Sequence, residues 1–378
     1  MEAWLRHLRD YVAIPSVNPM QSGGAAPEIQ GERRYAEHVA AQLRRIGLDA
    51  VVVGEGDRAS VVAQATAAGA TDTVLVASHL DTVPVDGMEI DPFDPRVEGG
   101  RLYGRGSCDT KSGMAAFVAA LERVLASGRL TRNVVVVGEA DEECGSVGVR
   151  DVLEHLGTKR PDWVLATEPT MMRLVTRHKG VARLELRASG VACHSSDPSR
   201  GRNAIVELSR AVLALDELAK ELARKVDPWL GPPTLSVGVV GGGVGANVVP
   251  AEAWLLMDRR LLPGETAESI TAEIRERLRR AGTEHVEITR TAVEKPPLLT
   301  EDDTRGARAC RAALEAVGLP VDSTVAAFGT DAGVFAEKGL PGVVIGPGDI
   351  AQAHTAREFV ELEQVAVATE FFTQLLRR

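Results

Sequence analysis

Two runs of β-branched residues, at residues 73–78 and 133–139, stand out along the chain. Runs of this kind, without a polar side, are typical of strands buried on both faces. The segment between them, residues 112–128, has apolar residues at helical spacing. A strand, a helix and a strand in this order predict a parallel crossover unit, because parallel strands need a connection of about a dozen residues or more.

Two helices and two short strands are predicted before this unit. Apolar residues from Trp4 to Val12 recur at helical spacing and stop before Pro15. A second helix is predicted from Gly31 to about Ile46, and the two short strands follow it. The alternation of helices and strands makes this part of the chain α/β.

The pattern of apolar and polar residues along the chain changes after residue 169. Residues 180–190 alternate between apolar and polar, as in a strand with one exposed face. A long helix near Asn203, a strand at 251–260 and a helix at 267–280 follow, which predicts a separate α+β domain. The predicted division is 1–179 and 291–378 for an interrupted outer domain and 180–290 for the inserted domain.

The composition limits the kind of partner. The 378 residues are 44% hydrophobic and 25% charged, with a formal net charge of −10. An acidic surface repels phosphates, so no nucleic-acid or membrane partner is expected. No apolar stretch is long enough to span a bilayer, and residues 1–10 lack the apolar core of a signal peptide. We therefore expect a cytoplasmic protein with a small polar substrate.

Neither the cysteines nor the glycines form a functional motif. The four Cys are scattered without a CxxC pair, which argues against a disulfide framework or a thiolate zinc site. The glycine-rich residues 238–250 have no following Lys-Ser or Lys-Thr, so a turn between two strands is predicted there rather than a phosphate loop.

A His and an Asp, His79 and Asp81, stand one residue apart where the first β-branched run ends. Residues i and i+2 of a strand face the same side, so the two side chains can touch. A carboxylate that accepts a hydrogen bond from one imidazole nitrogen leaves the other nitrogen for a metal ion. Taken alone, the pair fits better with a strand end that meets solvent.

Other acidic and histidine residues follow further predicted strands and loops. In open α/β sheets ligands bind at the carboxyl ends of the strands, so these side chains are expected to meet. Two His and three carboxylates there predict a binuclear metal site, with one Asp bridging ions about 3.5 to 4 Å apart. Such donors suit zinc or, less tightly, cobalt or manganese. A single carboxylate could be a turn residue or a helix cap, but five such ligands together fit that alternative poorly. The residues concerned are Asp109, Asp141, Glu142, Glu143, Glu168 and His354.

Several motifs, in this order, resemble those of the M20 family of metallopeptidases and amidohydrolases. The sequences of these motifs are most similar to those of the acetylornithine deacetylase branch, with succinyl-diaminopimelate desuccinylases and glutamate carboxypeptidases as near relatives. The resemblance covers essentially the whole chain and implies a zinc-peptidase-like α/β catalytic domain with a mixed sheet, interrupted by an inserted α+β lid and dimerisation domain. The motifs are SHLDTVP (78–84), LYGRGSCDTKSG (102–113), EADEECGS (139–146), TEPT (167–170), ACHSSDPSRGRNAI (192–205), NVVP (247–250), DRR (258–260) and GPGDIAQAHTAREF (346–359).

The resemblance also implies roles for these residues. It makes Glu142 the general base and implies a cis peptide bond between Asp109 and Thr110, while the strand spacing described above already predicts that Asp81 orients His79. Neighbours on an extended backbone point in different directions, so the residue after Glu142 can hold a metal ion while Glu142 faces the attacking water. The implied ligands are His79, Asp109 and Glu168 for one divalent ion, and Asp109, Glu143 and His354 for the other.

Three residues of the inserted domain are implied to complete the site. His194 resembles the histidine that stabilises the oxyanion of the substrate, often from the partner subunit of a homodimer. Asn247 and Arg259 resemble residues that hold the substrate carboxylate and nearby polar groups, and a guanidinium can bind a carboxylate through two parallel hydrogen bonds. Without the resemblance, a turn histidine, a turn asparagine and a surface salt bridge explain these residues better.

These observations favour a metal-dependent hydrolase that cleaves the amide bond of an N-acyl amino acid, as acetylornithine deacetylases do. The alternatives are a dipeptidase or carboxypeptidase that uses the same metals, a succinyl-diaminopimelate desuccinylase, and a non-catalytic metal-binding homologue. The last of these is disfavoured because a binding protein needs no carboxylate at the position of Glu142. The sequence does not identify the acyl group or the amino acid of the substrate.

Overall fold

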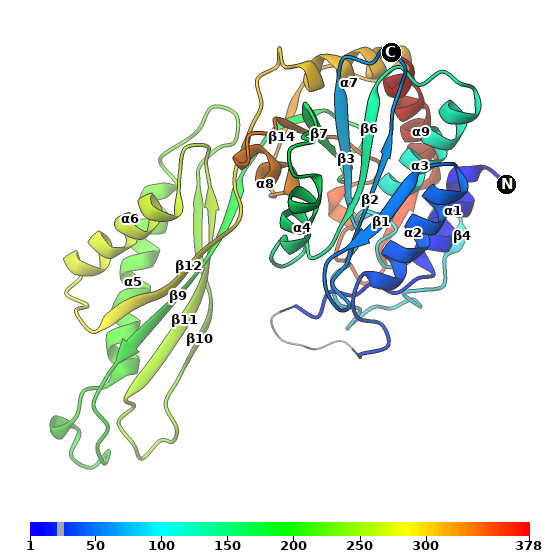
Figure 1. The fold of residues 1–378 in the computed structure, drawn as a ribbon. Helices are drawn as coiled ribbons and strands as arrows, with labels where there is room; N and C mark the ends of the chain where they lie inside the picture. The colour runs from blue at the N-terminus through cyan, green and yellow to red at the C-terminus, as the bar shows by residue number, and fades with distance from the viewer. Residues whose placement is uncertain (21–25) are drawn as a thin grey trace. The chain divides into compact units, whose positions relative to one another are not determined.

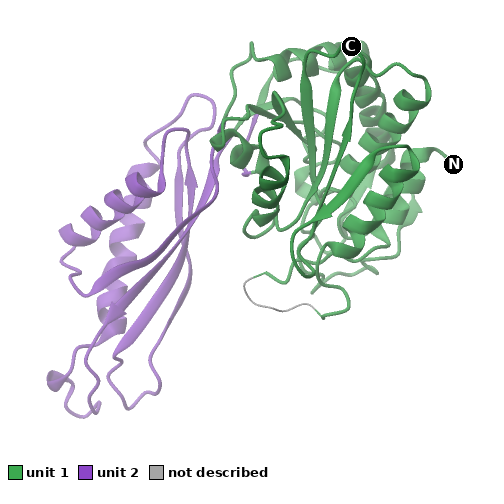
Figure 2. Ribbon diagram, viewed as in Figure 1, with its two compact units in different colours: residues 1–177, 299–324, 330–378 green, residues 178–298, 325–329 purple. Residues whose placement is uncertain are grey.

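The computed structural model describes residues 1–20 and 26–378. It contains two compact units, one formed by residues 1–177, 299–324 and 330–378 and the other by residues 178–298 and 325–329 (Figure 2). The chain therefore leaves the first unit and returns to it.

The first unit is built on a mixed sheet, which confirms the predicted α/β class. The strands of this sheet are β1 (Asp49–Val53), β2 (Ser60–Ala65), β3 (Thr73–His79), β6 (Asn133–Glu139), β7 (Trp163–Ala166), β8 (Val175–His178), β13 (Leu298–Leu299), β14 (Thr324–Ala326) and β15 (Gly342–Val344). Residues 178, 298, 325 and 326, in β8, β13 and β14, belong to the second unit. Within the described residues the order is β1-β2-β6-β3-β7-β15-β8-β13, with β14 beside β8 (Figure 1). β3 is parallel to β6 and β7, and β15 is parallel to β7, so the carboxyl ends of these four strands lie at one edge.

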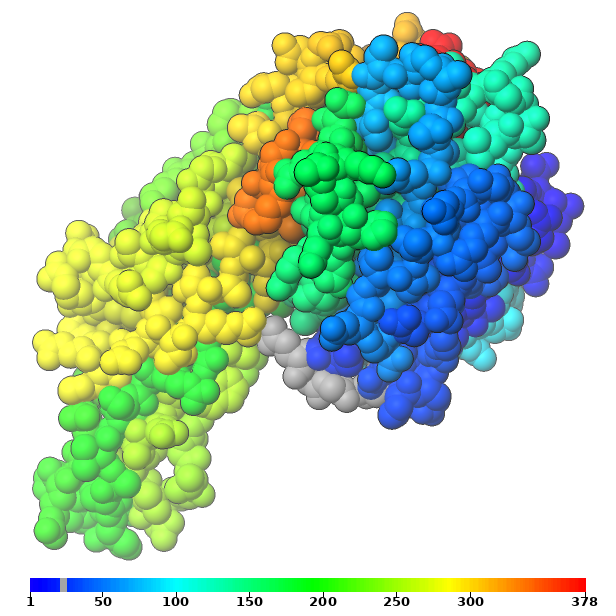
Figure 3. All heavy atoms as spheres, viewed as in Figure 1, coloured from blue at the N-terminus to red at the C-terminus, as the bar shows by residue number. Residues whose placement is uncertain are grey.

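Helices cover both faces of this sheet. They are α1 (Ala3–Val12), α2 (Arg33–Arg45), α3 (Lys111–Ala126), α4 (Val147–Leu156), α7 (Arg305–Ala316), α8 (Asp331–Glu337) and α9 (Leu362–Arg377), with a short 3₁₀ turn at Ile350–Gln352. The parallel crossover predicted from β-branched runs is confirmed by β3, α3 and β6. α4 and α8 lie side by side over one face (Figure 3).

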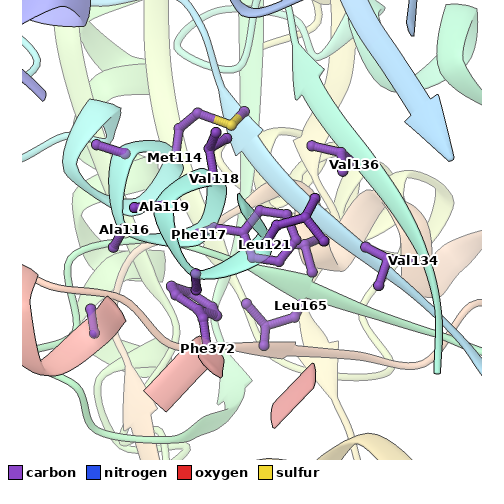
Figure 4. Close-up of a cluster of buried hydrophobic side chains, with 14 of the residues drawn as sticks. Met114, Ala116, Phe117, Val118, Ala119, Leu121, Val134, Val136, Leu165 and Phe372 are labelled. Atoms are coloured by element: carbon purple, nitrogen blue, oxygen red, sulfur yellow. The ribbon is translucent and has the colours of Figure 1, made fainter. Parts of the chain in front are cut away.

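Alternate residues of the buried strands face two separate cores, because side chains along a strand point to opposite faces. Val76 of β3 packs in the core that includes residues of α1, α2, α3, α7 and α9, part of which Figure 4 shows. Phe117 and Phe372 meet there edge to face, with ring centroids 5.4 Å apart. Leu75 and Ala77 instead join the core beneath α4 and α8.

A small sheet connects two segments of the first unit that lie far apart in sequence. It consists of β4 (Arg96–Glu98), β5 (Arg101–Tyr103) and β16 (Phe359–Glu361). β16 pairs antiparallel with β5, with Phe359 opposite Tyr103. The loop that follows β5 and the loop that precedes β16 are therefore neighbours.

The second unit is a four-stranded antiparallel sheet in the order β10-β11-β9-β12, with two helices packed on it. Its elements are β9 (Gly180–Ser189), a 3₁₀ turn (Pro198–Arg200), α5 (Ala204–Leu222), β10 (Thr234–Gly242), β11 (Glu252–Leu261), α6 (Ala267–Arg280) and β12 (Val286–Lys295). Asn203 caps α5, since its side chain accepts the backbone N–H groups of Ile205 and Val206. Residues 238–242 of the glycine-rich segment belong to β10, and residues 243–250 lie in the predicted connection between β10 and β11. Residue 290, the end expected for the inserted domain, falls inside β12, which continues to Lys295.

In residues 1–20 and 26–378, no helix combines the length and apolar character that crossing a membrane requires.

Candidate metal centre

The five candidate ligands lie at or beyond strand ends and loops of the first unit. His79 is the last residue of β3, Glu168 follows the end of β7, and Glu143 follows the end of β6. His354 lies in the segment after β15, and Asp109 lies in the loop before α3. Because the four strands run in the same direction, their carboxyl ends bring these segments to one edge of the sheet.

The ligand atoms form two groups that share Asp109. In one group, Nε2 of His79 lies 2.9 Å from Oδ1 of Asp109 and 3.9 Å from Oε2 of Glu168. In the other, Nε2 of His354 lies 3.3 Å from Oδ2 of Asp109 and 3.1 Å from Oε1 of Glu143. Each carboxylate oxygen of Asp109 therefore faces a different histidine, as a carboxylate that bridges two ions requires.

The spacing of these atoms fits a metal ion. A tetrahedral zinc ion with bonds of about 2.0 to 2.1 Å holds neighbouring ligand atoms about 3.3 Å apart. The separations from His79 Nε2 of 2.9 and 3.9 Å lie on either side of that value. Three donors of the imidazole and carboxylate type in each group match the protein ligands of catalytic zinc sites.

Contacts with carboxylates change the protonation of both histidines. Hydrogen bonds to Asp109 and Glu143 raise the pKa of His354 to about 11. Burial lowers the pKa of His79, but hydrogen bonds to Asp109 and Asp81 outweigh it and raise that pKa well above its ordinary value. A metal ion binds neutral imidazole, so metal binding at either group is coupled to proton release.

Asp81 has a wider role than the one predicted. The Nδ1 atom of His79 donates to the backbone oxygen of Asp81 at 2.9 Å and lies 3.5 Å from its carboxylate, which leaves Nε2 for a metal ion. The carboxylate accepts the backbone N–H groups of Glu142 and Glu143, each at 3.0 Å. Asp81 therefore holds the segment of the candidate base and its neighbouring ligand, as well as His79.

Asn18 and Arg58 support this segment, and neither was predicted from the sequence. The side-chain amide of Asn18 donates to Asp81 at 2.8 Å and to Asp141 at 3.0 Å. Arg58 pairs with Asp141 at 2.6 Å and donates to the side-chain oxygen of Asn18 at 3.1 Å. No periodic or motif signal links these positions, so only their placement in space reveals the network.

The peptide bond between Asp109 and Thr110 is cis, which confirms the expectation from the resemblance. Oγ1 of Thr110 donates to the backbone oxygen of Thr167 at 2.6 Å, and Oγ of Ser78 donates to the backbone oxygen of Thr110 at 3.3 Å. These bonds join the Asp109 loop to the ends of β3 and β7, where other candidate ligands lie.

His194 and Asn247 lie on two neighbouring exposed loops of the second unit. The backbone N–H of Ser195 donates to the backbone oxygen of Asn247 at 3.0 Å. The backbone N–H of Ser196 donates to Nδ1 of His194 at 3.1 Å. Because a backbone N–H can only donate, Nδ1 accepts, and the neutral ring then carries its proton on Nε2. Nε2 is therefore a hydrogen-bond donor suited to an oxyanion.

Arg259 is not placed to bind a substrate. Its side chain is fully buried, and its guanidinium donates to Glu265 at 2.5 Å and lies 3.6 Å from Glu273. Side chains alternate across β11, and Arg259 is on the buried face while Arg260 is on the partly exposed face beside Asp258. The predicted role of Arg259 as a carboxylate ligand is therefore not supported, and its contacts instead give it a structural role inside the unit.

Most of the chain matches a known protein family. Residues 75–378, which contain all five candidate ligands, match Peptidase family M20/M25/M40. An acetylornithine deacetylase from Myxococcus xanthus is 32% identical over 334 residues, which cover 86% of this chain and 82% of that protein.

Solved structures share the fold over the whole chain. An M20-family metallo-carboxypeptidase from Sulfolobus solfataricus has a TM-score of 0.82 at 22% identity and covers 100% of this chain and 99% of its own. A dinuclear metal-binding peptidase of the M20 family from Bacillus subtilis has a TM-score of 0.72 at 16% identity, covering 99% and 96%. At 22% and 16% identity, the structural similarity establishes that these proteins share one fold.

Proposed function

The chain belongs to peptidase family M20/M25/M40, whose members are hydrolases, and on this premise we propose that it cleaves the amide bond of an N-acyl amino acid. The observation that carries the proposal is the pair of ligand groups sharing Asp109, with Glu142 held next to the ligand Glu143. The similarity to an acetylornithine deacetylase favours an N-acetyl amino acid as the substrate class.

We propose that His79, Asp109, Glu143, Glu168 and His354 hold two divalent ions, zinc being the metal that these donors suit best. When bound, such ions lower the pKa of water and polarise a substrate carbonyl. Glu142 takes the proton of the attacking water and returns it to the departing amine. Glu142 is 8% exposed, so bulk water has little access to this residue.

Two residues of the second unit act on the substrate in this proposal. His194 donates from Nε2 to the oxyanion that forms when the carbonyl is attacked. Asn247 lies on the adjoining loop and binds polar groups of the substrate near its carboxylate. We propose that this unit is the lid that closes over the metal centre.

A substrate panel tests the proposal. The zinc-loaded protein is assayed with N-acetylornithine, N-acetylcitrulline, N-succinyl-diaminopimelate and a set of dipeptides. We expect kcat/KM for an N-acetyl amino acid to exceed that for any dipeptide by at least about tenfold, which corresponds to about 1.4 kcal/mol of transition-state binding. Faster cleavage of dipeptides would make the protein a peptidase, and zinc binding without any turnover would make it a non-catalytic homologue.

We propose a homodimer formed through the second unit. β10 is at an edge of its sheet and has exposed apolar residues, Val239 and Val240. Ile205 and Val206, at the start of α5, are also exposed. Apolar side chains exposed along an edge strand favour association with another chain.

Mixing two inactive variants tests whether a neighbouring chain supplies His194. His194→Ala and Glu142→Gln chains are combined under conditions that exchange subunits. Random exchange makes half of the dimers hybrid, and each hybrid has one site with both residues intact, so activity should recover to about one quarter of wild type. Each variant exchanged with itself is the control. Hybrids that form but stay inactive would place His194 in the site of its own chain.

A further inference from the structure

We propose that Glu358 is a positioning residue for the metal centre, whose buried carboxylate fixes the loop of Asp109 and so sets where the shared metal ligand lies. The inference rests on the proposed two-ion site, because it concerns the residue that both ions would share. Glu358 does not belong to either ligand group.

The side chain of Glu358 is 1% exposed, and its carboxylate accepts four hydrogen bonds from the Asp109 loop. Oε1 accepts the backbone N–H groups of Cys108 at 2.9 Å and Asp109 at 3.1 Å. Oε2 accepts the backbone N–H of Gly106 at 3.1 Å and the guanidinium of Arg105 at 2.7 Å. All four partners are donors, so the ionised carboxylate satisfies them together.

Glu358 accepts most of the backbone N–H groups of this loop. A buried backbone N–H without a partner is costly, so each donor of the loop must be accounted for. Glu358 accepts four of the six backbone N–H groups from residue 104 to residue 109, three with its carboxylate and that of Gly104 with its backbone oxygen at 3.1 Å. The other two go to the backbone oxygens of Pro92 and Gly104. These six N–H groups are therefore not paired within a helix or between the strands of a sheet.

Glu358 also connects the Asp109 loop to the second histidine ligand. It follows His354 by four positions in the same segment, directly before β16. Arg105 strengthens the connection, because it donates to the backbone oxygens of Thr355 at 3.4 Å and Pro84 at 3.1 Å as well as to Glu358. Glu358 and Arg105 therefore hold the segment of His354 beside the Asp109 loop, where Nε2 of His354 lies 3.3 Å from Oδ2 of Asp109.

Metal binding by Glu358→Gln tests the inference. The amide has nearly the same shape, but it lacks the charge and presents an NH₂ group to backbone donors, so the loop must shift. We expect zinc affinity to fall by about 10- to 100-fold, the loss typical when a hydrogen-bonding partner of a metal ligand is removed. Zinc titration by calorimetry measures affinity and stoichiometry, and the visible absorption of the cobalt-loaded protein reports ligand geometry.

Glu361→Gln is the matched control, because Glu361 lies in the same segment and forms a surface ion pair with Arg101 at 2.8 Å. It should bind zinc as the wild type does. Glu358→Asp keeps the charge, but its shorter side chain places the carboxylate oxygens farther from the loop. Its zinc affinity should therefore lie between those of the wild type and Glu358→Gln. If Glu358→Gln does not fold, the zinc titration and the cobalt spectrum of Glu358→Asp test the inference instead.

The results separate the two proposals. A folded Glu358→Gln or Glu358→Asp protein that is less stable, yet binds two zinc ions with wild-type affinity and an unchanged cobalt spectrum, would restrict Glu358 to a structural role and overturn the inference. A wild-type protein that binds no pair of ions would instead overturn the proposed function, and the inference with it.

Discussion

The Glu142→Gln variant is expected to lose at least about 10²-fold in kcat and to keep its bound metal. Gln has the size of Glu, but its amide cannot take a proton from water at neutral pH. Asp81 holds residue 142 through the backbone N–H, which the substitution leaves in place. Steady-state kinetics on an N-acetyl amino acid and metal analysis of the same preparation measure the two effects.

The adjacent variant Glu143→Gln is the control for this result. Glu143 belongs to a ligand group, so its replacement should lower metal content and kcat together. Turnover of Glu142→Gln near the wild-type value would assign the proton transfer to another group. A loss of metal equal to that of Glu143→Gln would make Glu142 a ligand instead of the base.

The Asp109→Ala variant is expected to lose both ions and all measurable activity. Oδ1 of Asp109 faces His79 and Oδ2 faces His354, so one substitution removes a donor from each group. Removing even an outer hydrogen-bonding partner of a ligand costs about 10- to 100-fold in metal affinity. Removing a direct ligand should cost at least the upper end of that range for each ion. Metal content after dialysis, measured beside the wild type, checks the expectation.

Two comparisons show whether Asp109 is shared. Glu168→Ala removes a donor from one group only, so it should retain about one ion per chain under conditions in which Asp109→Ala retains none. Asp94→Ala changes an exposed carboxylate outside both groups and should retain both ions. If Asp109→Ala also retained about one ion per chain, Asp109 would serve a single ion.

The elements and the candidate ligands could be predicted because their signals are local. β-branched runs predicted β3 and β6, and the spacing of apolar residues predicted α3 between them. Ligands gather where parallel strands end, so polar residues that follow such runs could be singled out before their contacts were known. His79 was found in this way.

The same local reasoning fails where a contact joins distant positions. Asn18 lies 63 positions from Asp81 and 123 from Asp141, and Glu358 lies 249 from Asp109. Nothing in the neighbourhood of Asn18 or Glu358 in the sequence indicates which partner the side chain meets.

By itself, then, the sequence determined the α/β class, the main strands and helices of the crossover unit and the types of candidate ligand at the strand ends, because the signals for these features are local. Only the tertiary structure decided which face of β11 is covered by helices, and with it that Arg259 is buried beside Glu265. It also decided that Asp81 and Glu358 accept backbone N–H groups from the loops of the candidate metal centre. A backbone N–H is present at nearly every residue, so its partner is fixed by the fold and leaves no trace in the residue type.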